Sequence, residues 1–149
     1  MSPKGRSILA VVAGMVTAFV TIMVVEFVGH TVYPPPPGID ISDPESLKTI
    51  IDSLPLGALV FVLVGWFIGT LDGSFLAALL APSSPQRHAL IVAALVLAAG
   101  VATMLMIPHP PWMWVAAFVI AAVAGFAGGQ LGARIAVIRA RQQESSPTL

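Results

Sequence analysis

The chain has 149 residues, of which 57% are hydrophobic and only 9% are charged, and its mean hydropathy is +0.94. A soluble domain needs more polar surface than this composition supplies, so we expect an integral membrane protein. The formal net charge is zero, and the chain contains no cysteine, which excludes disulfides, thiolate metal sites and thiol catalysis.

The first predicted span, residues 7–29, follows a basic start that carries Lys4 and Arg6. As a helix it is about 35 Å long, which is enough for the ~30 Å hydrocarbon core of a bilayer. A cleavable signal peptide has a similar basic start, but its apolar run is shorter and ends at a small-residue cleavage site. Because this run ends in Glu26-Phe27-Val28-Gly29-His30, we interpret it as a retained membrane helix.

The first outer loop, residues 30–55, opens with four consecutive prolines at 34–37, which cannot continue a helix. Asp43 and Pro44 are residue types that begin a new helix. After them, apolar residues recur at helical spacing, at Leu47, Ile50, Ile51 and Leu54. This pattern predicts a short amphipathic helix. Its polar face is acidic, so we expect a lid over the bundle rather than an anchor on anionic lipid.

Three further spans are predicted at residues 56–81, 89–107 and 112–135, and a polar tail that we expect to fray follows at 136–149. The fold class is therefore all-α: a single integral membrane four-helix bundle in up-down-up-down order, with the short amphipathic helix in its first outer loop. The basic residues indicate its orientation, because all but Lys48 fall on one side: Lys4, Arg6, Arg87, Arg134, Arg139 and Arg141. The positive-inside rule then places both termini in the cytoplasm, with Tyr33, Trp112 and Trp114 at the outer interface.

Small residues recur every four positions on two of the predicted spans. The rows are Gly65, Gly69, Gly73 and Ala77 on the second span, and Gly125, Gly129 and Ala133 beside Ala124, Gly128 and Gly132 on the fourth. Such rows let helix backbones approach closely, which favours packing in lipid. They can meet inside one chain or between two copies. The expected partners are therefore the lipid bilayer and either a second copy or a larger membrane complex, and no basic patch indicates nucleic acid.

The outer end of the bundle holds the first candidate site. Glu26 and His30 are four residues apart on one helix face, and His109 lies at the same outer level. A hydrogen-bonded clasp is the favoured interpretation. Proton or ligand handling and a metal site are the alternatives. Tyr33 and Trp112 lie at this same end and are included as candidate polar or ligand contacts.

Asp72 is the second candidate, because it lies roughly 13 Å inside the cytoplasmic boundary, where a charge costs about 2.5–3.5 kcal/mol. Thr17 lies near its depth and Gln130 about one turn shallower, so these residues and Thr70 predict a polar layer. A structural hydrogen-bonding role and a proton or ion site are equally favoured there.

The chain also resembles a group of small uncharacterised bacterial inner-membrane proteins with four predicted helices. The similarity rests on Glu26-Phe27-Val28-Gly29-His30, Tyr33-Pro34-Pro35-Pro36, Asp43-Pro44-Glu45, Leu54-Pro55 and Ile107-Pro108-His109-Pro110. The resemblance implies a bacterial inner (cytoplasmic) membrane setting, and it implies no activity, because that group has none assigned.

No motif in the sequence names a reaction, and no residue pattern indicates a cofactor. We therefore expect a non-enzymatic membrane protein, either an oligomer or an accessory subunit of a membrane complex. The alternative is a small proton- or cation-coupled transporter or channel-like protein that uses Glu26 and Asp72. A membrane enzyme with a metal held by His30, His109 and Glu26 is a third hypothesis.

Overall fold

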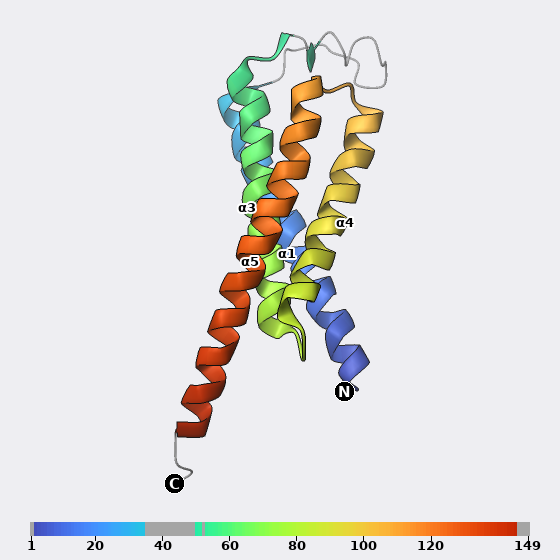
Figure 1. Cartoon of the computed structure of the whole chain (residues 1–149). Coiled ribbons are helices and arrows are strands. Elements are labelled where there is room, and N and C mark those ends of the chain that lie inside the picture. Colours follow the sequence, from blue (N-terminus) through green and yellow to red (C-terminus); the bar gives the residue numbers. More distant parts are fainter. Residues whose placement is uncertain (1, 35–49, 52, 146–149) are drawn as a thin grey trace.

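The computed structural model of the chain describes residues 2–34, 50, 51 and 53–145. Its long elements are four helices: α1 (Pro3–Val32), α3 (Leu56–Leu80), α4 (Pro85–Met106) and α5 (Pro111–Ser145). They lie side by side along most of their length (Figure 1). Each is long and apolar enough to cross a membrane. The prediction of an all-α protein with four membrane-length helices is confirmed.

Prolines define where these helices begin and end. Pro3 occupies the first helical position of α1, and the Ser2 side chain accepts a hydrogen bond from the Gly5 N–H at 3.2 Å. Proline suits this position because its missing N–H would be unpaired there anyway. Every proline in the described residues lies at a helix end or in a connection: Pro3, Pro34, Pro55, Pro82, Pro85, Pro108, Pro110 and Pro111. The helices are therefore uninterrupted across their apolar lengths.

Three of the helices extend beyond one or both ends of their predicted spans. α1 and α4 each begin four residues earlier than predicted, and α5 continues to Ser145, ten residues past the predicted end at 135. The frayed tail expected from residue 136 onward is therefore helical as far as Ser145. Charges mark where a helix leaves the membrane, whereas alanine, arginine and glutamine continue a helix into water equally well.

The amphipathic helix predicted in the first outer loop lies largely outside the described residues. Of its expected apolar positions, Ile50 and Ile51 are helical, and the Leu54 N–H donates to the Ile50 carbonyl at 3.0 Å. Its predicted polar face, and its position as a lid, fall on residues that the structure does not describe.

Glycines bring α1 and α3 into backbone contact. A Cβ atom on Gly14 would lie 2.6 Å from the Gly73 carbonyl oxygen, and one on Gly73 would lie 2.5 Å from the Gly14 carbonyl oxygen. One turn away, Gly69 faces the backbone of Ala18 and the side chain of Ile22. The predicted small-residue row of the second span therefore packs on the first helix of the same chain.

The two predicted rows of α5 face different helices. Gly128 and Gly132 lie against the α3 backbone at Leu71 and Phe75, whereas Gly129 faces the Gln86 and Ala89 side chains of α4. Within the described residues, α1 and α5 share no contact. All three glycine-bearing rows thus contact helices of the same chain.

The outward surface of the bundle is strongly apolar. Phe27, Leu105 and Met106 expose 71%, 74% and 80% of their area, and every helix carries further large apolar side chains facing outward. Water-soluble monomers rarely expose contiguous apolar patches of this extent. With the four membrane-length helices, this surface indicates a membrane protein whose outer face meets lipid. Both chain termini and the α3–α4 connection lie at one end of the bundle, and the α4–α5 connection lies at the other (Figure 1).

Candidate functional site

Asp72 lies half-buried on α3 at the edge of the α1–α3 contact. Its Oδ2 accepts a hydrogen bond from the Thr21 Oγ1 of α1 at 3.5 Å, the upper end of the range for such bonds. The bond joins two helices whose backbones touch at Gly14 and Gly73. Asp72 is thus the one carboxylate in the described residues that bonds a second helix, and that bond is long.

The partner of Asp72 is Thr21, and not Thr17 as the depth count predicts. Helix side chains lean toward the N-terminus of their own helix. The α1–α3 contacts pair rising residue numbers on α1 with falling numbers on α3, so the side chains of Asp72 and Thr21 lean toward each other. Thr17, one turn earlier on α1, leans away from the carboxylate. The sequence could have indicated Thr21 as a partner of Asp72, because Thr21 shares a helix face with Thr17.

The other predicted members of the polar layer lie elsewhere. Thr70 is 1% exposed and lies between α3, α4 and α5, two positions from Asp72 and therefore on another face of α3. Gln130 is half-buried on α5, and no hydrogen bond within the described residues joins it to Asp72. Within the described residues, none of the other three predicted members is hydrogen-bonded to Asp72, whose partner is Thr21.

In the part of the chain that the structure describes, Glu26, His30 and His109 are not joined to one another. Glu26 is half-buried and His30 is exposed on α1, whereas the His109 Nδ1 lies 2.6 Å from the Ile107 carbonyl oxygen of its own connection. Among the described residues, no hydrogen bond or ion pair joins either α1 side chain to His109, and no group of three His, Asp or Glu can hold a metal ion. α1 and α4 diverge toward this end of the bundle, which separates the residues (Figure 1).

Tyr33 and Trp112 have different environments. The Tyr33 ring meets the Phe61 ring edge-on, with centroids 6.4 Å apart and an interplanar angle of 67°, and it lies against Gly57. Tyr33 therefore packs the end of α1 onto α3. Trp112 is 41% exposed at the start of α5, where an amphipathic ring suits a membrane interface.

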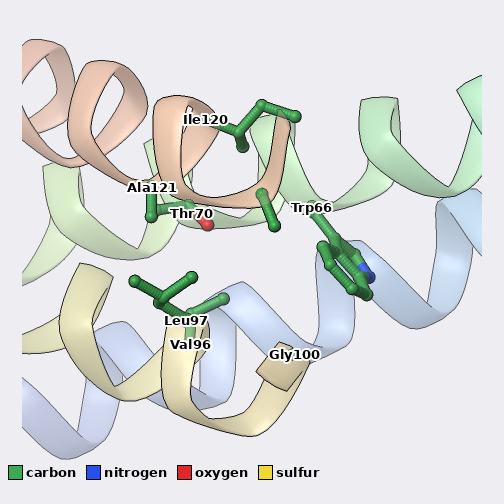
Figure 2. Close-up of a pocket in the computed structure, with 8 residues that line it drawn as sticks. Trp66, Thr70, Val96, Leu97, Gly100, Ile120 and Ala121 are labelled. Carbon is green, nitrogen blue, oxygen red and sulfur yellow. The ribbon is translucent and has the colours of Figure 1, made fainter. Parts of the chain in front are cut away.

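The space between α3, α4 and α5 is nearly filled. A cavity of about 10 Å³ remains there, and Figure 2 shows Trp66 and Thr70 from α3 facing Val96, Leu97 and Gly100 of α4. One water needs about this volume and two to four polar partners, whereas the Thr70 hydroxyl is the only polar side-chain oxygen lining it. Among the described residues, the space between α3, α4 and α5 therefore has no room for a substrate.

Three hydrogen bonds at the other end of the bundle were not predicted. The Ser74 Oγ donates to the Ala89 carbonyl at 3.1 Å, and the His88 Nδ1 lies 3.2 Å from the Ser84 carbonyl oxygen. The Gln86 Nε2 donates to the Phe126 carbonyl at 3.5 Å. The helical spacing of Gln86 and His88 with the buried face of α4 could have indicated these bonds, but the predicted span begins only at residue 89.

A second cavity, of about 510 Å³, opens on the surface where α1 and α3 meet near the N-terminus. It is lined by Arg6, Leu9 and Ala10 of α1 and by Leu80 of α3. It is much larger than the space inside the bundle, and three of its four lining side chains are apolar.

The chain was also compared with known proteins. No family model, curated protein or solved structure matches it.

Proposed function

We propose that this protein is a non-enzymatic subunit of a membrane assembly, either a homo-oligomer or a larger complex. One observation carries the proposal: the described space between α3, α4 and α5 is filled except for about 10 Å³, while the Asp72 carboxylate lies half-buried at the edge of a helix pair with a single long bond. A carboxylate at this depth is costly unless it is neutral, faces water or is paired. A neighbouring membrane helix that donates to Asp72 would meet that need.

The proposed setting is a bacterial inner membrane, crossed in up-down-up-down order with both termini in the cytoplasm. Six of the seven lysines and arginines support this orientation, because they lie in the first turns of α1 and α4 and in the C-terminal part of α5, which share one end of the bundle (Figure 1). The resemblance to small bacterial inner-membrane proteins supports the compartment, and membership of that group is part of the proposal.

The partner has to use a surface other than the glycine rows, because those rows are filled by helices of the same chain. Two half-buried carboxylates lie on the membrane-length helices: Asp72, which bonds Thr21, and Glu26, nearly two turns before the end of α1. We therefore place the contact at the Asp72 edge of the α1–α3 pair, where a donor from another chain can reach the carboxylate.

The mass of the protein extracted in mild detergent tests this proposal. Wild-type protein should be recovered in an assembly larger than one chain, and Asp72→Leu should reduce it to a single chain while its helix content stays unchanged. Glu26→Gln is the matched control, because it alters the other half-buried carboxylate and should leave the assembly intact. A wild-type protein that is monomeric in both detergent and lipid nanodiscs would overturn the proposal.

Proton- or cation-coupled transport is the second candidate function. It is favoured by the presence of two half-buried carboxylates, Glu26 and Asp72, on helices long enough to cross a membrane. The assay is proton and cation flux into liposomes that contain the purified protein. Flux that exceeds empty liposomes and disappears in the Glu26→Gln, Asp72→Asn double variant would replace the subunit proposal with this one.

A further inference from the structure

The surface cavity near the N-terminus combines one cationic and three apolar side chains. Leu9 and Leu80 form its walls and are 54% and 44% exposed, so no part of the described chain covers them. The Arg6 guanidinium is exposed at the same cavity, and no carboxylate pairs with it within the described residues. At about 510 Å³ the cavity lies within the ~300–1,000 Å³ range of small-molecule sites.

The depth of the cavity fits the boundary between headgroups and acyl chains. α1 has 30 residues and is about 45 Å long, whereas a hydrocarbon core of about 30 Å takes up only some 20 of them. Arg6 stands in the first turns of α1, and Leu9 and Ala10 follow it toward the apolar part of the helix. The charged group therefore lies toward water and the apolar walls lie toward lipid.

We propose that this cavity binds one anionic phospholipid, with the Arg6 guanidinium on the phosphate and an acyl chain along Leu9 and Leu80. A guanidinium donates paired hydrogen bonds to phosphate oxygens, and this geometry favours a phosphate over a neutral headgroup. The apolar walls favour an amphiphile over a soluble phosphate, which would leave Leu9 and Leu80 uncovered. The other basic residues at this end of the bundle, such as Arg87 and Arg134, attract anionic lipid to the same leaflet.

Lipid exchange on the purified full chain tests the proposal. The protein is placed in nanodiscs of mixed phosphatidylglycerol and phosphatidylcholine, and the lipids retained by each chain are counted by native mass spectrometry. Wild-type protein should retain phosphatidylglycerol preferentially. Arg6→Gln should lower this preference at least about fivefold, which is the loss expected for one basic residue at an anionic surface.

Two further variants separate the cavity from general surface charge. Arg141→Gln is the matched control, because it removes the same charge from the exposed end of α5 and should leave the preference unchanged. Leu80→Trp fills the cavity without changing its charge, and should reduce retention of phosphatidylglycerol. Thermal unfolding of each variant confirms that the fold is kept.

Four results would overturn the proposal. Equal losses in Arg6→Gln and Arg141→Gln would indicate a diffuse basic surface. Unchanged retention in Leu80→Trp would show that the cavity is not used. Equal competition by soluble glycerol phosphate would indicate a free phosphate as the ligand, and a dimer that only Arg6→Gln dissociates would indicate a second copy in the cavity.

Discussion

The α1–α3 contact depends on glycines, which carry a hydrogen atom where other residues carry a Cβ atom. At Gly14 and Gly73 an added Cβ would approach a carbonyl oxygen of the facing helix to 2.6 and 2.5 Å, closer than real Cβ atoms come. Gly65 lies on the same row, but its Cβ would meet the Val25 side chain at an ordinary 3.4 Å. Gly73 therefore has no room for a Cβ atom, whereas Gly65, on the same predicted row, has room for one.

This contrast predicts the outcome of one substitution at two positions. Gly73→Ala should lower the free energy of unfolding by about 1–3 kcal/mol, because the facing Gly14 backbone has to move away. Gly65→Ala should be neutral or slightly stabilising, since alanine is the better helix former and has space there. Thermal unfolding of both variants in one detergent measures the difference, and equal melting temperatures would contradict the close contact.

Asp72 provides the second prediction at this scale. Asp72→Asn keeps an oxygen that accepts from the Thr21 hydroxyl, so the long Thr21–Asp72 bond can persist without the charge. We expect the expression and melting temperature of Asp72→Asn to match those of wild type, as measured by fluorescence size-exclusion chromatography with heating. A large loss of either would show that the ionised carboxylate stabilises the fold.

At the scale of the helices, sequence patterns predicted where each helix lies along the chain, but not which side chains of neighbouring helices meet. Prolines and hydropathy placed all four helices, because both act locally along the chain. The pairing of Asp72 with Thr21, and the division of the α5 glycines between α3 and α4, depend on how each helix is rotated about its axis. That rotation is set by packing against other helices, which one helix's sequence does not contain. For the same reason, equal depth alone does not bring Glu26 and His109 into contact, and no hydrogen bond joins them among the described residues.

The long α5 predicts which part of the chain is dispensable for folding. Its 35 residues extend about 53 Å, more than a bilayer with its headgroups, and residues 137–145 are exposed throughout. Deleting residues 137–149 should leave the melting temperature unchanged. Gly132→Ala, one turn before the deleted segment, should lower the melting temperature because its Cβ would meet the Phe75 carbonyl oxygen. A melting temperature that falls on deletion would show that the projecting end packs on the bundle.

For the whole molecule, the central claim is that four helices carry the chain back and forth through the membrane with both ends on the cytoplasmic side. The structure supplies helices of sufficient length and an apolar outer surface. The basic residues supply the direction. The absence of cysteine makes the claim directly testable, because every introduced thiol is the only one in the chain.

Single-cysteine labelling with a membrane-impermeant maleimide is the most direct test. Thr31→Cys at the end of α1, Ser83→Cys in the α3–α4 connection and Ser145→Cys at the end of α5 replace exposed side chains. In intact cells Thr31→Cys should react, while Ser83→Cys and Ser145→Cys should react only after the cells are opened. Reaction of all three in intact cells, or of Ser83→Cys and Ser145→Cys but not Thr31→Cys, would contradict this account.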